Sequence, residues 1–580
     1  MLKQLAGCVR EYKRPTILTL IFIVGEAVIE TIIPFITANL VNRIKAGASI
    51  ESVMEVGLLL IIMAAISLVC GGLAGFTCAK ASTGFAKNLR SDLFHRIQTY
   101  SFENIDKFSS SSLVTRMTTD VTNVQMAFMM LIRIAIRSPL LLIFSTVMAF
   151  VMGGKLAFVF VVVIPILAFG LLAIGKKAMP AFRSVFKKYD RLNESIEENV
   201  RGMRVVKGFS REEYEKQKFN TAADNIRKDF TKAECIVALN TPLMNLCMYI
   251  NMVVVLLVGS KLAITSGGSA LDVGQISGML TYGMQILMSL MMLSMIYVMV
   301  TMSAESAKRI CEVLEEEPSL KEPEHPVMEV KDGSIEFKNV NFKYSAKAKK
   351  YALSDIDLSI RSGMTVGIIG GTGSSKSSLV QLIPRLYDVT EGAVLVGGVD
   401  VRSYDIPTLR SAVAMVLQKN VLFSGTIKDN LRWGNENATD EEITEACRLS
   451  QADEFIQTFP DKYDTYIEQG GSNVSGGQKQ RLCIARALLK KPKILILDDS
   501  TSAVDTKTDA LIRAGFKNYI PDTTKIIIAQ RIASVEDADL IIVMDNGSIS
   551  AAGTHEDLLQ SSDIYREVYE QQTKGGNENE

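Results

Sequence analysis

The residues best suited to chemistry lie in a short glycine-rich segment, GMTVGIIGGTGSSKSSLVQLI, at residues 363–383. Its order of apolar strand, glycine-rich turn and helix is that of a phosphate-binding loop, in which backbone N–H groups and a helix N-terminus meet phosphate oxygens. We expect Lys376 to reach the β- and γ-phosphates of a nucleotide and the Ser377 hydroxyl to bind Mg²⁺. The predicted nucleotide-binding residues of this loop are Gly370, Thr372, Gly373, Ser374, Ser375, Lys376, Ser377 and Ser378.

The position immediately before the lysine departs from the usual phosphate-loop pattern, which has glycine there. In this chain the residue is Ser375. If the position requires a positive φ, serine costs about 1 kcal/mol or more relative to glycine; if φ is negative, serine costs little. We expect nucleotide binding to survive in either case.

Two further segments complete a recognisable pattern. Asp498 ends the apolar run ILILD and suits a second carboxylate that holds Mg²⁺. Between the loop and this aspartate lies NVSGGQKQRLCIARAL, residues 473–488. With loop, signature and carboxylate in this order, the chain resembles half of an ATP-binding cassette (ABC) exporter over nearly its whole length. The resemblance implies an all-α, six-helix transmembrane domain followed by an α/β P-loop nucleotide-binding domain.

Other motifs of the family can be matched residue by residue, and they imply ATP and Mg²⁺ as cofactors. Tyr344 matches the aromatic residue that stacks on adenine. Gln418 matches the glutamine that senses Mg²⁺ and faces the membrane domain, so the implied Mg²⁺ ligands are Ser377, Gln418 and Asp498. The signature, which contacts the γ-phosphate held by the opposite subunit, is Ser475, Gly476, Gly477 and Gln478.

Two residues depart from the family pattern at the position of hydrolysis. The residue after Asp498, usually a glutamate that activates water, is Asp499, and the switch residue, usually histidine, is Gln530. Because aspartate is one methylene shorter, its carboxylate is retracted by roughly 1.5 Å, and errors near 1 Å can slow a reaction about 100-fold. Glutamine can hydrogen-bond a phosphate but lacks the positive charge available to histidine. Asp499, Gln530 and Gln418 are therefore candidate catalytic residues of a slow site.

The resemblance also bears on partners, because in this family each ATP lies between the phosphate loop of one subunit and the signature of the other. A homodimer of this chain would have two sites without the glutamate and the histidine. A heterodimer with a second, non-identical half-transporter would have one competent site, to which this chain supplies Ser475–Gln478. We therefore expect ATP-driven export of amphipathic or drug-like compounds, with hydrolysis mainly at the partner's site.

Alternative functions remain open from the sequence. They are export of peptides, lantibiotics or lipids, and a non-transporting role as an ATP-sensing regulatory subunit. Nucleic-acid repair enzymes share such cassettes, but the long apolar runs of this chain exclude them, so no nucleic-acid partner is expected. The expected partners are the second half-transporter, the lipid bilayer and a hydrophobic or amphipathic small molecule.

The elements that must position these residues differ between the two halves of the chain. The protein has 580 residues and no net charge, yet its long apolar runs all lie before residue 305. A membrane span needs about 20 mostly apolar residues. Six stretches qualify, at about residues 16–42, 56–79, 134–153, 156–175, 237–264 and 276–302.

Lys and Arg concentrate in the long connections 80–133 and 176–236. By the positive-inside rule these connections, both termini and the C-terminal half lie in the cytoplasm. The predicted domains are a membrane domain over 1–310, a linker over 311–330 and a nucleotide-binding domain over 331–575. We expect the chain to reside in the plasma membrane of a bacterium.

Glu26 and Glu30 lie inside the first span, four residues apart and hence on one helix face. Carboxylates at membrane depth are costly and face a cavity or a partner. They therefore either attract a cationic substrate, or lie near the outer interface or pair with a neighbouring helix. The sixth span is rich in methionine, an adaptable residue of promiscuous surfaces. The candidate cavity residues are Glu26, Glu30, Met288, Met292 and Met295.

Overall fold

The computed structural model describes residues 2–266, 271–345, 348–499 and 504–577. The chain divides into two compact units. The helical unit comprises Met1–Gln98 and Ser109–Glu316, and the α/β unit comprises Thr99–Phe108 and Glu317–Glu580. The all-α membrane part followed by an α/β part confirms the predicted fold class.

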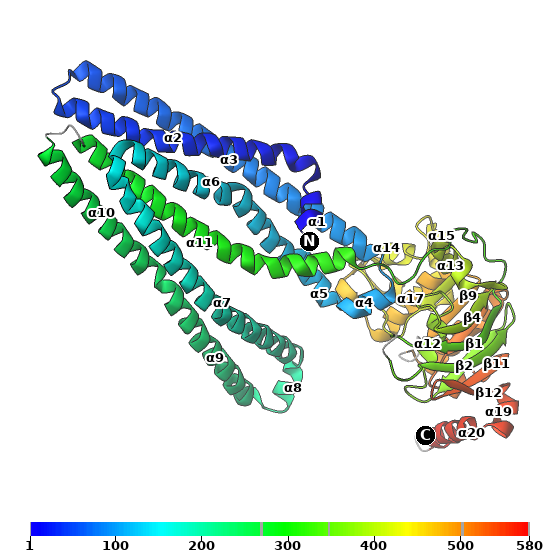
Figure 1. The fold of residues 1–580 in the computed structure, drawn as a ribbon. Coiled ribbons are helices and arrows are strands. Elements are labelled where there is room, and N and C mark those ends of the chain that lie inside the picture. Colours follow the sequence, from blue (N-terminus) through cyan, green and yellow to red (C-terminus); the bar gives the residue numbers. More distant parts are fainter. Residues whose placement is uncertain (1, 267–270, 346–347, 500–503, 578–580) are drawn as a thin grey trace. The chain divides into compact units, whose positions relative to one another are not determined.

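The helical unit consists of long helices joined by short turns (Figure 1). In an apolar environment a helix satisfies every backbone group within itself, which is why apolar runs of this length form helices. The elements are α1 (Leu2–Gly7), η1 (Arg10–Tyr12), α2 (Lys13–Lys45), α3 (Ile50–Gln98), α5 (Ser110–Thr115), the π-helical turn η2 (Arg116–Asp120), α6 (Val121–Gly153), η3 (Gly154–Ala157), α7 (Phe158–Arg201), α8 (Met203–Gly208), α9 (Glu212–Ala238), α10 (Asn240–Thr265) and α11 (Val273–Glu315).

Five helical segments of the described residues are long and apolar enough to cross a membrane. The third, Ser110–Phe182, runs through both α6 and α7, which the short turn η3 separates. The six predicted spans therefore fall in α2, α3, α6, α7, α10 and α11. The apolar surface of α3 is open, with Leu68 77% and Phe76 69% exposed, as expected of side chains that face lipid.

Several helices are longer than a bilayer is thick. α3 has 49 residues, which corresponds to about 74 Å, whereas the hydrocarbon core measures about 30 Å. α7 and α9 run antiparallel, pack against each other and are joined through α8 (Figure 1). α11 continues to Glu315, so this helix occupies the first residues of the predicted linker 311–330, because Ile310 and Val313 remain buried against the unit.

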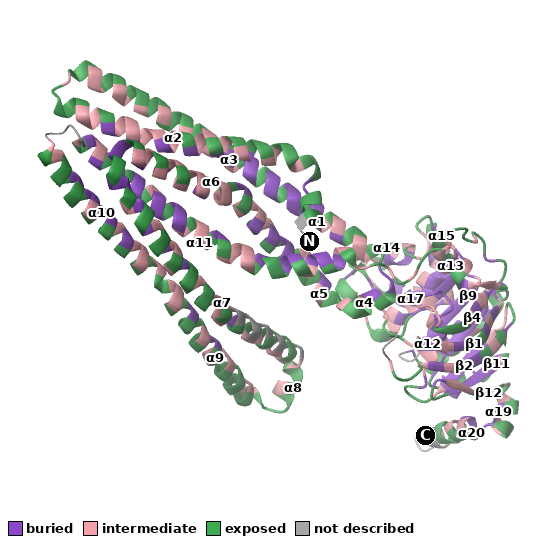
Figure 2. Cartoon of the chain, in the orientation of Figure 1, coloured by how far each residue is buried: buried purple, intermediate pink, exposed green. Residues whose placement is uncertain are grey.

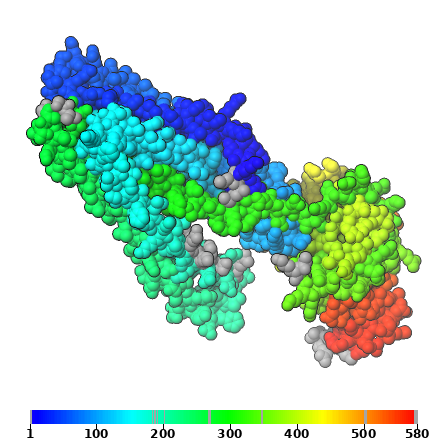
Figure 3. Space-filling model, in the orientation of Figure 1, coloured from blue at the N-terminus to red at the C-terminus, as the bar shows by residue number. Residues whose placement is uncertain are grey.

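The α/β unit contains two main sheets and the helices around them. Its elements are α4 (Phe102–Phe108), β1 (Ile335–Phe342), β2 (Leu353–Ile360), β3 (Thr365–Gly370), α12 (Lys376–Gln381), β4 (Glu391–Val396), β5 (Val399–Asp400), η4 (Val401–Ser403), α13 (Ile406–Ala412), β6 (Val413–Val416), β7 (Gly425–Thr426), α14 (Ile427–Arg432), α15 (Asp440–Leu449), α16 (Asp453–Gln457), η5 (Lys462–Asp464), β8 (Tyr466–Ile467), η6 (Gln469–Gly471), α17 (Gly476–Leu489), β9 (Ile494–Asp498), α18 (Thr506–Tyr519), β10 (Thr524–Ile528), η7 (Ile532–Ser534), β11 (Leu540–Asp545), β12 (Ser548–Gly553), α19 (His555–Ser561) and α20 (Asp563–Asn577). The C-terminal elements, red in Figure 3, gather at one end of this unit.

The larger sheet positions the site. Its strand order is β12-β11-β3-β10-β9-β6, and all of these strands are parallel except β12. Every residue of β9 and β10 is buried, as in a sheet covered on both faces (Figure 2). Ile528 of β10 is in register with Asp498 of β9 and with Ile368 of β3. The segments that follow these strands therefore emerge together at one edge of the sheet.

The smaller sheet, β2-β1-β4-β5, is antiparallel and shares a hydrophobic core with one face of the larger sheet. This core includes Phe337, Phe342, Leu379 and Val394, so it joins β1 and β4 to the helix that follows the phosphate loop. Tyr344 lies two residues after the end of β1, near that helix.

The short helix α4 belongs to the α/β unit, although the residues before and after it in the chain belong to the helical unit. The predicted membrane domain 1–310 had included α4. Asn104 of α4 accepts hydrogen bonds from the backbone N–H of Ser101 and of Ser319, both at 3.1 Å. Its amide donates to the Glu317 carbonyl at 3.0 Å. Asn104 is only 3% exposed, and its buried hydrogen bonds explain why residues 99–108 pack with the α/β unit.

Candidate nucleotide-binding site and membrane cavity

The phosphate loop lies between β3, which ends at Gly370, and α12, which begins at Lys376. A Cβ at Gly370 would be 2.2 Å from the carbonyl oxygen of Met544, so only glycine fits there. Ser375 adopts φ +69° and ψ +25°, the left-handed conformation. Of the two alternatives for this position, the structure therefore has the one in which serine is strained relative to glycine.

Lys376 folds back over the loop. Its Nζ donates to the carbonyl oxygens of Gly370 at 2.8 Å and Gly371 at 2.9 Å, and to the Ser374 hydroxyl at 3.3 Å. The pKa of Lys376 is lowered, because the effect of burial exceeds the opposing effect of the Asp499 and Asp498 charges. The ammonium group thus rests on neutral carbonyl groups, which an incoming anionic phosphate can replace with a stronger, charge-assisted contact.

The two residues predicted to hold Mg²⁺ on this chain's loop and strand are in contact. The Ser377 hydroxyl donates to Oδ1 of Asp498 at 2.9 Å, and Asp498 is 3% exposed at the end of β9. Burial raises the pKa of Asp498, and the charge of Asp499 adds to the rise, against the hydrogen bond from Ser377 and the charge of Lys376. A buried carboxylate beside a hydroxyl is a fitting pair of hard oxygen ligands for Mg²⁺.

The three candidate catalytic residues also meet. Gln530, which follows β10, donates from Nε2 to Oδ2 of Asp499 at 2.7 Å, and Gln418 donates to the same oxygen at 3.4 Å. Asp499 has φ +50°. The two positions that depart from the family pattern are thus directly hydrogen-bonded to each other, because β9 and β10 are neighbouring parallel strands.

The backbone around Gln530 is held by a residue that the sequence analysis missed. Gln572 of α20 donates from Nε2 to the Gln530 carbonyl oxygen at 2.9 Å, and its Oε1 accepts from the Ile532 N–H at 2.9 Å. One side-chain amide therefore bonds to the backbone at both ends of the segment 530–532, which follows β10. No sequence signal could have identified Gln572, because it lies on an exposed helix face about 40 residues away in the chain.

Tyr344 contacts the phosphate-loop helix directly. Its hydroxyl lies 2.7 Å from the Ser378 hydroxyl and donates to Oε1 of Gln381 at 3.3 Å. The residue is 41% exposed, so ring surface remains open for a base to stack on. Burial of its hydroxyl end raises the pKa of Tyr344.

A second tyrosine, also missed, extends this contact to α4. Tyr387 packs edge-on against Tyr344, with ring centroids 5.1 Å apart and planes at 89°. The Tyr387 hydroxyl donates to Oδ2 of Asp106 at 2.8 Å, and burial together with this carboxylate raises its pKa. The ring of Phe102 in α4 also lies near the Tyr387 ring, with the two ring centroids 6.0 Å apart. Within the α/β unit, α4 is thus connected to the loop helix α12 through two tyrosines.

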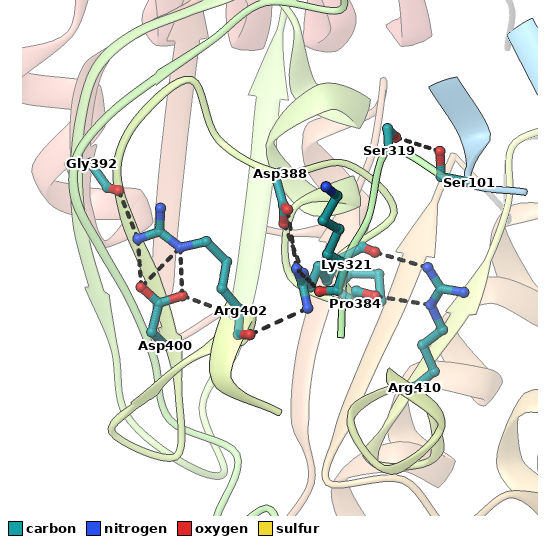
Figure 4. A network of polar contacts seen from close by, with 10 residues as sticks. Ser101, Ser319, Lys321, Pro384, Asp388, Gly392, Asp400, Arg402 and Arg410 are labelled. Carbon is teal, nitrogen blue, oxygen red and sulfur yellow. Dashed lines mark hydrogen bonds and ion pairs between the residues drawn. The ribbon is translucent and has the colours of Figure 1, made fainter. Parts of the chain in front are cut away.

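A buried arginine fixes the chain beside Tyr387. Arg385, 3% exposed, donates to Asp388 at 2.8 Å and to the Lys321 carbonyl at 3.0 Å. Figure 4 shows these contacts together with Arg410, which donates to the Arg385 carbonyl at 2.9 Å. Burial lowers the pKa of Arg410. Because each buried guanidinium has oxygen partners, the segment that carries Tyr387 is held in one conformation.

The signature residues lie on a different element, at the N-terminus of α17. Ser475 caps this helix: its Oγ accepts from the Gln478 N–H at 3.3 Å, and its own N–H donates to Oε1 of Gln478 at 2.9 Å. Ser475 and Gly476 are exposed and Gly477 is partly exposed. The signature is therefore a preformed helix N-terminus that is open at the surface of this chain.

The candidate substrate residues separate into two groups. The Arg137 guanidinium of α6 lies 2.6 Å from Glu30 and 3.4 Å from Glu26, so both carboxylates pair with a neighbouring helix, one of the alternatives left open above. Glu30, Met288 and Met292 line a cavity of about 730 Å³. Glu26 and Met295 are absent from the described residues that line it, and Met295 is 57% exposed elsewhere on α11.

Comparisons with known proteins agree with this geometry. Residues 16–290 match the ABC transporter transmembrane region and residues 353–502 match the ABC transporter family. The chain is 36% identical to the uncharacterized ABC transporter ATP-binding protein YfiB of Bacillus subtilis (strain 168), with 96% of each chain covered. It is 35% identical to the uncharacterized ABC transporter ATP-binding protein MT1311 of Mycobacterium tuberculosis (strain CDC 1551 / Oshkosh), again with 96% of each covered.

The fold is also similar to that of a solved structure, a bacterial Atm1-family ABC exporter with ATP bound. The TM-score is 0.84 at 23% identity, and the match covers 97% of this chain and 99% of that one. The two family matches fall in the helical unit and in the α/β unit, in that order. This chain therefore belongs to the ABC transporter family: it joins a transmembrane region to an ABC ATPase domain and has the fold of an ABC exporter half-transporter.

Proposed function

We propose that this ABC exporter chain is the slow-site half of a heterodimer that exports amphipathic or drug-like compounds. In this proposal its own ATP site hydrolyses slowly, and its signature, Ser475–Gln478, completes a competent site on a non-identical partner chain. The observation that carries the proposal is the direct hydrogen bond between Asp499 and Gln530, 2.7 Å long. The two residues that depart from the family pattern meet at one carboxylate oxygen, Oδ2 of Asp499. Both departures therefore affect the same step, the activation of water.

The geometry explains why hydrolysis would be slow. Asp499 is shorter than glutamate, and its Oδ2 accepts hydrogen bonds from the amides of Gln530 and Gln418. These bonds occupy lone pairs of Oδ2 that a base needs to take a proton from water. Gln530 cannot contribute a positive charge to a phosphate.

Binding of nucleotide does not depend on those two residues. In this proposal Lys376 and the backbone of the loop bind the phosphates, and the Tyr344 ring stacks on the base. Ser377 and Asp498 would hold Mg²⁺, which, when bound, neutralises phosphate charge. The proposed arrangement is a site that binds ATP firmly and turns it over slowly.

The location of the exporter is part of the proposal. The charge pattern of the connections supports cytoplasmic termini, and the similar chains of Bacillus subtilis and Mycobacterium tuberculosis are bacterial. We infer a plasma-membrane protein of a bacterium, with both termini in the cytoplasm.

The decisive test is the ATPase activity of the full chain purified alone in nanodiscs. Wild type is expected near background, and Asp499→Glu combined with Gln530→His is expected to raise turnover at least tenfold, since misplacement by about 1 Å costs up to about 100-fold. Lys376→Ala in the double-substituted chain is the matched control and should return turnover to background. Vigorous ATP hydrolysis by the wild-type chain without a partner would rule out the slow-site assignment.

A further inference from the structure

The helical unit contains a cavity whose chemistry the proposed function leaves undefined. It measures about 730 Å³ and lies among α2, α6 and α11, which Figure 1 shows side by side. These helices are joined by polar contacts: Gln285 of α11 donates to the Glu30 carbonyl at 3.2 Å and accepts from Ser145 of α6 at 2.9 Å. The cavity is thus part of a fixed three-helix arrangement large enough for a small amphipathic molecule.

The charged groups at this cavity are unevenly paired. One carboxylate, Glu30, and two guanidinium groups, Arg133 and Arg137, line it, and both nearby carboxylates, Glu30 and Glu26, lie on Arg137. Arg137 bonds to Glu30 at 2.6 Å and also contacts Glu26. Glu26 is not among the described residues that line the cavity, and its Oε1 lies 3.1 Å from the position of a Cβ at Gly71 on α3.

Arg133 is the group without a partner. Among the described residues it has no hydrogen bond and no ion pair. The residue is exposed and is one of those that line the cavity, and its Nη atoms lie 3.9 Å from the position of a Cβ at Gly75 on α3. Arg133 and Arg137 are four residues apart and therefore present their guanidinium groups on the same face of α6. Arg137 also has a buried Nε without a hydrogen-bond partner in the described part of the chain. Unused arginine donors in an apolar region are costly unless an anion or water takes them.

The remaining wall is mostly apolar, with the polar residues Ser138, Thr281, Gln285 and Ser289 among its members. Five of the sixteen lining residues are methionines, including Met284, Met288 and Met292 on successive turns of α11. Methionine side chains fit apolar bodies of different shapes. We propose that this cavity binds an amphipathic anion, with its oxyanion head group, a carboxylate or phosphate, on Arg133 and its apolar body against the methionines.

This assignment rests on the proposed export function and narrows its substrate class. It also replaces the expectation that Glu26 and Glu30 attract a cation. Glu30 is already neutralised by Arg137, and Glu26 does not reach the cavity. A guanidinium group presents paired N–H donors that match the geometry of a carboxylate or phosphate, which makes Arg133 the specificity-determining residue.

The test is equilibrium binding to the full chain in nanodiscs of zwitterionic lipid, with empty nanodiscs as background. Three probes share a dansylamino-undecyl body and carry a carboxylate, a primary amide or a trimethylammonium head. The carboxylate probe is expected to bind about tenfold more tightly than the other two. Arg133→Gln should remove this preference without changing binding of the amide probe, and Arg133→Lys should retain part of it.

Lys155→Gln is the matched control, because it removes a positive charge from the same unit outside the cavity and should leave all three affinities unchanged. Unchanged affinity of the Arg133 variants for the amide probe shows that their cavity is still formed. Equal affinity for the three probes, a preference for trimethylammonium, or an unaltered Arg133→Gln variant would overturn the proposal.

The source of the anion is resolved by a second arm. Anionic phosphatidylglycerol added to the nanodiscs should displace the carboxylate probe, in an Arg133-dependent manner, if a lipid is the natural occupant. No displacement assigns the site to a soluble amphipathic anion. Since neither arm requires hydrolysis or a partner chain, failure of binding can be told apart from failure of the heterodimer proposal.

Discussion

At the scale of single residues, the phosphate loop carries a local conformational cost. Ser375 occupies the left-handed region at φ +69°, where glycine is usual. Neighbouring Lys376 donates to the Gly370 carbonyl, and Ser377 donates to Asp498. The strain therefore affects stability rather than the chemistry of the loop.

Replacing Ser375 with glycine is expected to stabilise the protein. Relief of the left-handed conformation is worth about 1 kcal/mol or more, reduced by the greater freedom of glycine in the unfolded chain, so a net gain of up to about 1 kcal/mol is expected. Thermal unfolding of the full chain without nucleotide measures it. Ser472→Gly is the matched control: Ser472 has φ −65°, so that change should lower the unfolding midpoint or leave it unchanged.

Asp498 is costly to bury in its ionised form. Its raised pKa means that the folded chain binds this proton more tightly than the unfolded chain, so the ionised carboxylate destabilises the fold above that pKa, and the cost disappears as pH falls through it. Asp498→Asn, which can still accept from Ser377, should therefore raise the unfolding midpoint at pH 7.5, and the gain should shrink in acid.

The same substitution should abolish the extra thermal stabilisation that MgATP gives over ATP with EDTA. Asp557→Asn is the control, and it should lower the unfolding midpoint at pH 7.5 instead of raising it. Hydrogen bonds with Thr554 lower the pKa of Asp557, so its ionised form favours the fold at neutral pH. Destabilisation of the metal-free chain by Asp498→Asn at pH 7.5 would contradict this account.

At the scale of elements, the site depends on helices that are remote in sequence. α4 reaches the loop helix α12 through Tyr387 and Tyr344, and α20 brackets the segment after β10 through Gln572. The parallel strands bring the motif residues to one edge of the sheet. The added helices determine how firmly those residues are held there.

The contacts of Gln572 predict a graded response. Gln572→Ala removes both hydrogen bonds and should speed amide hydrogen exchange at Ile532 about fivefold. This factor corresponds to the loss of one hydrogen bond worth about 1 kcal/mol. Gln572→Glu keeps the acceptor for the Ile532 N–H, so exchange there should stay near wild type. Gln571→Ala, whose side chain donates instead to Glu567, should have no effect. Unchanged exchange at Ile532 in Gln572→Ala would show that the bracket does not hold this segment.

At the scale of the whole molecule, the proposed division of labour places different tasks on the two nucleotide motifs of this chain. The phosphate loop would serve its own slow site, whereas the open N-terminus of α17 would serve the partner's site. Substitutions in the two motifs should therefore have unequal effects in the complex.

In the heterodimer, Gly477→Asp is expected to abolish ATP turnover, since a carboxylate at the start of α17 repels the γ-phosphate that this helix end would otherwise attract. Lys376→Ala, which affects only this chain's own loop, should leave a substantial part of the turnover. The measurement is steady-state ATPase of the reconstituted pair, with ATP binding by the Gly477→Asp chain as the folding control. Equal loss in both variants would contradict the asymmetry.

Local sequence was sufficient for much of this protein. Apolar runs longer than a bilayer require helices, and the loop Gly370–Ser378 and the carboxylate Asp498 are recognisable because their chemistry depends on neighbours in the chain. The residues that depart from the family pattern, Asp499 and Gln530, could also be identified without coordinates. What they do to each other could not, since their hydrogen bond joins segments that follow two different strands.

The sequence by itself thus determined the membrane and nucleotide-binding halves and most of the nucleotide motif. The tertiary structure decided the left-handed conformation of Ser375, the placement of α4 and the hydrogen bonds of Gln572. It also decided the pairing of Arg137 with Glu30, which leaves Arg133 without an ion pair in the described part of the chain. The physical reason is the range of the interactions: spans and loops arise from contacts between near neighbours in the chain. Ion pairs such as Glu30–Arg137 form only when helices about 100 residues apart pack together.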